Sequence, residues 1–564
     1  MRTLRWGILL LIFLGSRISA VECWVAREGK PTAVIIRPGS SATDLSDSIA
    51  ELQSLIQRMS GAQVELSQAP TAGSGSLWLL TEADLPQFGS SLPDTSQLRA
   101  LNAEGFIIRV GDGQAWLVGR TELGLQHAIY WLLEQWGCRW LFPGKAGEVV
   151  PSSPALSITS EMQTTQQPRF LMRNLWYNYA SWLPEGIMVD YRLWIRRNRM
   201  QYSLTGSIQH NYHNIVSFKD EALFQQHPDF FPLKRGRHVR EGQMVTEHPL
   251  VRQRAVDYAF DYFRRFPSEQ MVSMSPNDGG GPWRSELSRR ARFTDAAVDL
   301  ANHVARALRD NPDTADKKVG MYAYFITALP PTVRVEDNVV IFVATRFTPL
   351  PWRTLLDGWS RKASSLGIRG YASVVDWYKT RPTWRLGQLE RQVRFWDKRG
   401  VIGVSIESGN DWGGWGLYHY MLARLLWNPE EEVNRVVEDF IKKGFGEAAG
   451  DMNRYFKRWT CGYSTQARSL AGQDVRGALG KSVDPAVRDR IRLYGLYLHH
   501  LRLLDDYFAA QTAQERKLRL QELVGFAWRL APTNMAHTVP LVDRYCVKWA
   551  ARDGITREQI EAWK

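Results

Sequence analysis

Apolar and polar residues alternate with two different periods in the first quarter of the chain. The short apolar runs TAVIIRP and SLWLLT predict buried strands. Between them, apolar side chains recur at helical spacing, which predicts a helix from Asp44 to Ser60 that ends before Gly61. The segment GFIIRVGDGQAWLVG predicts a hairpin, and a second helix is expected from Thr121 to Trp136. We therefore expect a small α/β domain, followed by the linker PSSPALSITS.

Farther along, short apolar runs alternate with amphipathic stretches. The runs predict eight strands, over 170–177, 201–207, 242–248, 271–278, 320–325, 339–345, 370–377 and 401–408. The amphipathic stretches predict helices, for example over 251–265, 295–309 and 386–399. Eight strands alternating with helices over about 250 residues are typical of a (β/α)8 TIM barrel.

The last part of the chain has a helical pattern. Asn428 and Pro429 fit the cap and first position of one helix, and Asp484 and Pro485 fit those of a second. A third helix is expected from about Ala513 to Leu530. We therefore expect an α-helical C-terminal domain.

The N-terminus differs from all of these regions. Arg2 and Arg5 precede an apolar run from Trp6 to Gly15, and small residues at 18–20 offer a cleavage site. This arrangement predicts a secretory signal peptide and a periplasmic or extracellular protein. No later stretch is long and apolar enough for a transmembrane segment. The predicted division is a signal peptide over 1–20, an N-terminal α/β domain over 21–158, a barrel over 168–430 and a helical domain over 431–564.

Composition and charge limit the classes of partner and cofactor that this protein is expected to bind. The formal net charge is +13, but the basic residues are dispersed, so nucleic acid is not an expected partner. An anionic polysaccharide suits a basic exported protein, and general solubility is the alternative. The sequence has no HExxH motif, no Cys/His cluster and no GxGxxG after a strand, so no metal or cofactor is expected. Scattered cysteines permit up to two disulfides or none, at Cys23, Cys138, Cys461 and Cys546.

Three carboxylates fall at the C-terminal ends of predicted strands, where barrels place their active sites. They are Asp278, Asp376 and Glu407. Glycoside hydrolysis needs one protonated and one ionised carboxyl group beside the scissile bond. We expect Asp278 to be the general acid, Glu407 the nucleophile or base, and Asp376 an orienting group, with the first two roles open to exchange. A helix cap or a buried ion pair is the alternative for each.

Other side chains at the same strand ends are candidate sugar ligands. Aromatic rings stack on the C–H faces of pyranoses, and a few polar groups fix the orientation of the sugar. The predicted substrate-binding residues are Arg173, His210, Asn277, Trp283, Tyr324, Arg346, Trp412 and Trp415. For the tryptophans, packing inside the barrel is the alternative.

Several segments resemble known families. GFIIRVGDGQAWLVGRTELGLQHAIYWLLEQWGCRWLFPGKAGEVVP resembles the small α/β domain that precedes the barrel in alpha-glucuronidases and beta-hexosaminidases. HNIVSFKDEALFQQHPDFFPL, SMSPNDGGG and GVSIESGNDWGGWGLYHYMLARLLWNP resemble a family of secreted bacterial proteins. That family joins this N-terminal domain to a domain of unknown function with a glycosidase-like barrel. The resemblance spans residues 30 to 460 and implies a carbohydrate-active fold and glycoside hydrolysis.

The resemblance does not carry a complete mechanism. Beta-hexosaminidases have adjacent Asp and Glu at the end of the fourth strand, where this chain has Asn277 and Asp278, so their mechanism does not carry over. Alpha-glucuronidases use a fourth-strand acid with later acidic residues, and the three candidate carboxylates match that pattern only loosely.

The sequence therefore predicts an exported glycoside hydrolase that acts on an oligo- or polysaccharide. Uronate-containing chains are one candidate class, because Arg173 and Arg346 would suit a carboxylate. A non-catalytic saccharide-binding or cell-envelope protein with a degenerate barrel is the main alternative, and a uronate lyase is a third. Oligomeric state and stereochemical outcome stay open at this point.

Overall fold

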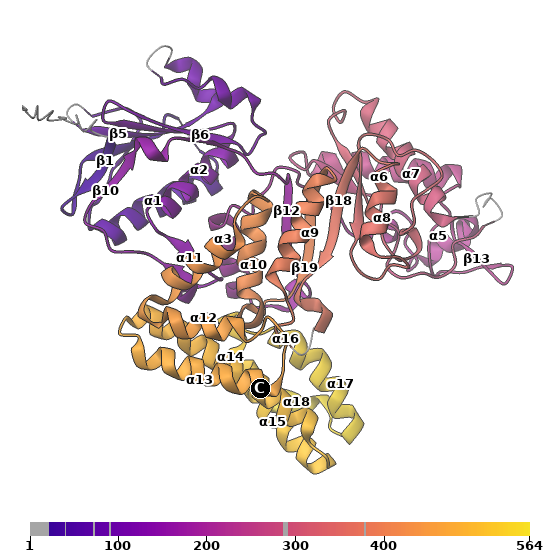
Figure 1. The fold of residues 1–564 in the computed structure, drawn as a ribbon. Coiled ribbons are helices and arrows are strands. Elements are labelled where there is room, and N and C mark those ends of the chain that lie inside the picture. The colour runs from indigo at the N-terminus through magenta and orange to yellow at the C-terminus, as the bar shows by residue number, and fades with distance from the viewer. Residues whose placement is uncertain (1–21, 40, 72–73, 89–91, 286–291, 377–379) are drawn as a thin grey trace, which may run out of the picture. The chain divides into compact units, whose positions relative to one another are not determined.

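The computed structural model describes residues 22–39, 41–71, 74–88, 92–285, 292–376 and 380–564, and it divides into two compact units (Figure 1). The first unit contains residues up to Ile129 and Ser152–Gln166, and the second contains Tyr130–Pro151 and Gln167–Lys564. The predicted signal peptide over 1–20 lies outside the described residues. Within the described part, no helix has the length and apolar character needed to cross a bilayer.

The first unit is built on a mixed six-stranded sheet with the order β11-β6-β7-β5-β3-β4. Its strands are β3 (Ala33–Ile36), β4 (Leu66–Ser67), β5 (Gly75–Thr81), β6 (Phe106–Gly111), β7 (Gln114–Gly119) and β11 (Thr164–Gln166). A second sheet has the order β10-β1-β2, from β1 (Glu22–Arg27), β2 (Lys30–Pro31) and β10 (Leu156–Thr159). The expected helices are α1 (Thr43–Ser60) and α2 (Glu122–Gln135), and the expected hairpin is β6–β7, so the local predictions for this region are confirmed.

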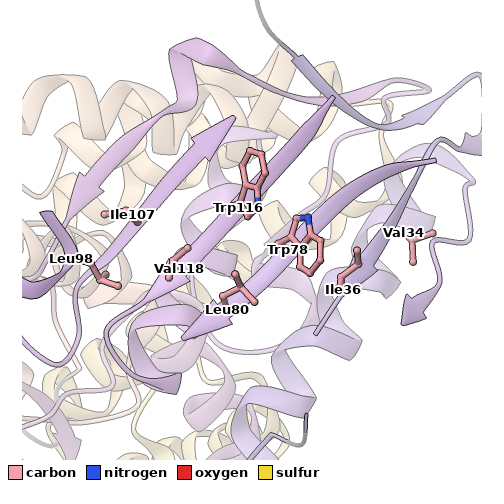
Figure 2. Close-up of a cluster of buried hydrophobic side chains, with 8 residues drawn as sticks. All are labelled: Val34, Ile36, Trp78, Leu80, Leu98, Ile107, Trp116 and Val118. Atoms are coloured by element: carbon pink, nitrogen blue, oxygen red, sulfur yellow. The ribbon is translucent and has the colours of Figure 1, made fainter. Parts of the chain in front are cut away.

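Alternate residues of this sheet form one apolar core, which Figure 2 shows. Trp78 of β5 lies in register with Trp116 of β7, and Leu80 with Val118. Because side chains alternate between the two faces of a strand, this register gathers the four on one face. Burial of each large apolar side chain contributes about 2–3 kcal/mol.

The second unit is built on a curled parallel sheet with the order β12-β19-β18-β17-β16-β15. Its strands are β12 (Met172–Tyr177), β15 (Met271–Ser273), β16 (Lys318–Ala323), β17 (Val339–Ala344), β18 (Ser365–Tyr371) and β19 (Val401–Ser408). Helices alternate with these strands along the chain, as parallel connections require. They include α3 (Glu185–Arg197), α6 (Pro249–Arg265), α7 (Phe293–Arg309), α8 (Trp352–Trp359) and α9 (Leu386–Lys398). The α/β class and the parallel sheet are confirmed.

The expected eight-stranded closed barrel is not what the described residues form, because two predicted strands are missing from the ladder. Residues 201–207 contribute one isolated bridge, Gly206 to Met271. Residues 242–248 form no strand, since the Gln243 N–H donates to Pro282 O at 2.9 Å and the Val245 N–H to Phe230 O at 2.9 Å. These hydrogen bonds hold the segment in the long connection between β12 and β15, outside the sheet. The curled sheet is therefore a half-barrel of six strands.

The chain after β19 is helical. It contains α10 (Trp412–Trp427), α11 (Val433–Phe445), α12 (Ala449–Lys457), α13 (Thr465–Lys481), α14 (Pro485–Ala509), α15 (Ala513–Leu530) and shorter segments (Figure 1). The predicted starts of α14 and α15 are confirmed: Asp484 accepts from Ala486 N at 2.7 Å, and Thr512 and Glu515 form a capping box. The predicted start at Pro429 is wrong, because α11 begins at Val433.

Buried histidines occur in and beside these helices. His419 of α10 contacts Ser408 Oγ through Nε2 at 2.8 Å, and His537 Nδ1 lies 2.6 Å from Asn410 Oδ1. Both of these rings and His500 of α14 are buried. Burial lowers the pKa of each of the three to about 3, because the charged imidazolium loses its hydration.

We expect the free energy of unfolding to fall as the pH drops below about 6.5. The folded pKa of each buried histidine lies below its ordinary value of 6.5, so the unfolded chain binds these protons first. Each histidine then costs on the order of 1 kcal/mol of stability per pH unit between about 6.5 and 3. Urea unfolding from pH 8 to pH 5 measures this slope. His419→Gln should make it shallower, whereas the exposed His213→Gln should leave it unchanged, and equal slopes in all three proteins would contradict the explanation.

Candidate active site

Glu407 lies at the C-terminal end of β19, between the ends of two neighbouring strands. In the parallel register it is the partner of Trp176 on β12 and of Tyr371 on β18. Its side chain is 7% exposed. One carboxylate oxygen forms an ion pair with Arg369, and the other accepts a hydrogen bond from the Asn178 amide. Groups on β18 and just after β12, the two strands that flank β19, therefore hold the Glu407 carboxylate.

Arg369 is the cation of this pair and is itself enclosed by aromatic rings. It is a buried residue of β18, and its guanidinium carbon lies 4.6 Å from the Tyr371 ring centroid, 4.7 Å from that of Trp176 and 5.7 Å from that of Tyr322. Rings at these distances attract the cation through their quadrupoles. An arginine removed from water needs such compensation in addition to its carboxylate.

Asp278 follows β15 and forms a second, more open group of polar side chains. It is 72% exposed, and its Oδ1 lies 3.5 Å from His210 Nε2. His210 Nδ1 lies 2.6 Å from Pro276 O, and a carbonyl requires a donor, so Nδ1 carries the proton. Burial lowers the pKa of His210, and in the neutral ring Nε2 is a bare acceptor that faces Asp278.

Tyr324 connects the two groups. Its ring centroid lies 5.5 Å from that of His210. The pKa of Tyr324 is raised to about 12, first by burial, then by the charge and hydrogen bond of Asp278, and further by the charge of Glu407. The phenol thus lies within electrostatic reach of both carboxylates. Both acids lie at or just after the C-terminal ends of strands of the same parallel sheet, and we call this end of the sheet, with Asp278, His210, Tyr324, Arg369 and Glu407, the mouth.

The remaining predicted residues are mostly engaged with protein groups. Arg173 is buried and donates to Phe170 O at 2.7 Å and Arg199 O at 2.9 Å. Asn277 Oδ1 accepts from His213 N at 2.8 Å. Trp283 packs beside Phe293 at 5.3 Å, and Arg346 is exposed after β17. Asp376 ends the 3-10 turn η9 (Ser373–Asp376), and its side chain lies outside the described residues.

Both tryptophans after Glu407 are buried, and the glycines beside them serve packing. The Trp412 indole N–H donates to Tyr177 Oη at 2.6 Å, and that of Trp415 to Arg381 O at 3.1 Å. A side chain at Gly413 would place its Cβ 2.7 Å from Met535 O and against the Tyr497 ring. The glycines therefore allow Tyr497 of α14 to pack against the start of α10. Trp412 is enclosed by protein, whereas Trp415 lines a pocket of about 360 Å³.

Sequence reasoning missed several residues of the mouth. Arg369 lies inside the apolar strand SLGIRGY, and a charge there is a usable signal, since buried charges need partners. Phe347 is 58% exposed after β17, with its ring 5.3 Å from that of Tyr371. No sequence pattern marks Phe347. The described residues contain no group of three or more His, Cys, Asp or Glu side chains that could hold a metal ion.

Three aromatic residues beyond strand ends have left-handed backbone conformations. Tyr179 follows β12 with φ 55°, Phe325 follows β16 with φ 48°, and Phe347 follows β17 with φ 57°. Bulky residues rarely adopt positive φ, and such strain of about 1–2 kcal/mol is concentrated at functional sites. The strain therefore marks the same end of the sheet as the two carboxylates.

We expect Arg369→Met to destabilise the protein by about 3–5 kcal/mol, because it leaves the Glu407 carboxylate buried without its cation. Arg361→Met removes an exposed arginine and should change stability by no more than about 0.5 kcal/mol. The double variant Arg369→Met with Glu407→Leu should recover part of the loss. Denaturant unfolding measures all three proteins, and a small effect of Arg369→Met would show that the pair is not a stabilising unit.

Comparison with known proteins gives this geometry a context. No curated protein sequence matches the chain. Among solved structures, similar folds occur in glycoside hydrolases. One is a family GH115 4-O-methyl-alpha-glucuronidase with specificity for decorated arabinogalactans, with a TM-score of 0.60 at 12% identity over 95% of this chain and 80% of that one. At this identity the likeness shows the fold alone.

Two further structures are more distant. A GH138 enzyme targeting pectin rhamnogalacturonan II has a TM-score of 0.47 at 11% identity, over 94% of this chain and 100% of that one. CpGH84D has a TM-score of 0.49 at 10% identity, over 96% of this chain and 91% of that one. Neither likeness is strong enough to support an argument about this chain. The sequence model of DUF4838, a domain of unknown function, matches residues 142–457 of the 564, and the chain belongs to this family.

Proposed function

We propose that the protein is an exported glycoside hydrolase that cleaves O-glycosidic bonds in an oligo- or polysaccharide. The observation that carries the proposal is the placement of two carboxylates at the C-terminal ends of strands of one parallel sheet, Glu407 at the end of β19 and Asp278 just after β15. Two carboxyl groups on one aromatic-lined mouth are the minimum that glycoside hydrolysis requires. The glycosidase-like fold is consistent with this assignment.

The surroundings of the two acids differ, and this difference supports one assignment of their roles. Both oxygens of Glu407 accept hydrogen bonds, from Arg369 and Asn178, which suits the unprotonated partner. Glu407 acts on the anomeric carbon directly or through water. Asp278 is exposed and faces the bare nitrogen of His210, so it can gain a proton from solvent and pass it to the leaving oxygen. Asp376 retains its proposed orienting role.

Closure of the curled sheet into a barrel is part of the proposal. The Leu204 N–H donates to Leu171 O at 3.0 Å, just before β12. A few residues later, Ser207 N donates to Met271 O and Asn211 N to Ser275 O, each at 3.0 Å, along β15. The segment 204–211 thus reaches both outer strands of the sheet. It supports a mouth that is walled on this side as well.

A specific observation favours one alternative, a non-catalytic saccharide-binding protein. Glu407 is buried, and both of its carboxylate oxygens are paired with protein groups, as in a purely structural acid. In that case the mouth would bind a sugar through Tyr324 and its neighbours without cleaving it. A substitution that keeps the shape of Glu407 separates the two functions.

We expect Glu407→Gln to lower turnover by at least 100-fold on every substrate, because the amide cannot act as nucleophile or base. Asp278→Asn should reduce turnover most for sugars with poor leaving groups and least for activated aryl glycosides, which need little protonation. Hydrolysis of a panel of aryl glycosides and oligosaccharides measures both effects. Glu241→Gln removes an exposed carboxylate that pairs with Lys234 and is the matched control.

Two results would reject the hydrolase. Wild-type protein that binds sugars but turns over none of the panel would favour the binding protein. Products that absorb in the ultraviolet would indicate elimination, and hence a lyase. If hydrolysis occurs, NMR identifies the anomer that is released first. This anomer shows whether the configuration at the anomeric carbon is retained or inverted.

A further inference from the structure

A pocket of about 900 Å³ opens beside the proposed mouth. Its walls are the loop 345–352 that follows β17, together with Tyr371, Val374, Arg544 and Tyr545. Tyr371 also packs on Arg369, which forms the ion pair with Glu407. Tyr371 therefore both lines the pocket and contacts the arginine that pairs with Glu407.

Two arginines supply the charge of this pocket. Arg346 and Arg544 both line it, and no acidic side chain is among its described lining residues. Within the described part of the chain, neither arginine has an ion-pair partner. Planar guanidinium groups donate paired hydrogen bonds that match the two oxygens of a carboxylate. The positive charge of the pocket thus favours the binding of an anionic group.

Aromatic rings supply the apolar walls and hold one of the arginines. The Arg544 guanidinium carbon lies 5.3 Å from the Tyr179 ring centroid and 5.6 Å from that of Tyr545. Phe347 is exposed on the opposite loop in its strained conformation, 5.3 Å from the Tyr371 ring. A sugar ring needs such apolar faces, whereas a small inorganic anion does not.

The backbone that carries Arg544 is itself unusual. Leu541–Cys546 forms a π-helix, a rare conformation that occurs frequently at functional sites. The preceding segment is fixed to the start of α10, because Trp412 N donates to Asn534 O at 2.9 Å and Gly413 N to Met535 O at 3.0 Å. Arg544 is therefore held at a set position relative to the loop after Glu407.

We propose that this pocket is a subsite for a uronate residue, with Arg346 and Arg544 binding its carboxylate and Phe347 and Tyr371 contacting its ring. The inference rests on the proposed function, because it places the subsite next to the proposed mouth. It assigns substrate recognition to the C-terminal helical segment as well as to the sheet.

Free uronates test the subsite without any dependence on hydrolysis. We expect glucuronate or galacturonate to bind the full chain at least tenfold more tightly than glucose or galactose, measured by calorimetry at low salt. Arg346→Gln and Arg544→Gln should each weaken uronate binding about ten- to a hundredfold, since each removes charged hydrogen bonds. Arg552→Gln changes the net charge equally in an exposed position outside the pocket and should bind like the wild type.

The outcomes separate this inference from the hydrolase. Equal affinity for charged and neutral sugars, or wild-type affinity in Arg544→Gln, would overturn the subsite. Inorganic sulfate that competes as well as uronate would overturn the sugar assignment and leave an anion site. Arginine-dependent uronate binding in a protein that hydrolyses nothing would support the subsite while rejecting the catalytic proposal.

Phe347→Gly tests the aromatic wall, because loss of the ring should weaken uronate binding, whereas relief of the backbone strain should stabilise the fold. Glycine accepts positive φ without strain, and the exposed ring contributes little to the core, so the melting temperature should stay the same or rise by about 1–2 °C. Uronate affinity should fall several-fold in the same variant. Phe347→Ala is the matched control, with equal loss of affinity and no rise in melting temperature. A lower melting temperature with unchanged affinity would make Phe347 a packing residue.

Discussion

The buried ion pair between Arg369 and Glu407 is the constraint on which the mouth depends. Two opposite charges removed from water are tolerated only when the geometry satisfies both of them. Here, that geometry takes Trp176 from β12 and Asn178 just after it, Arg369 and Tyr371 from β18, and the acid from β19. A shift of β18 or β19 would separate the two charges, and a shift of β12 would remove the Asn178 hydrogen bond. The pair therefore fixes the relative positions of three strand ends, and with them the mouth.

The two sides of the mouth have contrasting properties. On one side, Glu407 is enclosed, paired and surrounded by rings, which gives it a single orientation. On the other, Asp278 is exposed to solvent beside His210. In the proposed reaction, the enclosed acid is the acceptor and the accessible acid carries the proton. Tyr324 follows β16, a strand that lies between β15 and β19 in the order of the sheet, and the charges of both acids help to raise its pKa.

Local pattern predicted much of this structure, and long-range contacts decided the rest. The caps of α14 and α15 follow from residues next to each other in sequence, and Glu407 was placed correctly at the end of its strand. The segment 242–248 looked like a strand, but its polar groups are taken by Pro282 and Phe230, far away in sequence. Trp412 looked like a sugar platform, but Tyr177 and α14 enclose it. Arg544 had no signal, because only the folded chain brings it to the pocket.

The glycines at the start of α10 have a consequence for how the chain can be divided. They lie against Tyr497 and Met535, so side chains from the last hundred residues fill the space directly behind the loop that follows Glu407. A fragment cut at residue 457, where the family match ends, would expose this surface and lose Arg544. The terminal helices therefore pack against the loop at the C-terminal end of β19 and support it. Truncation at the family boundary would take away a wall of the cavity together with its support.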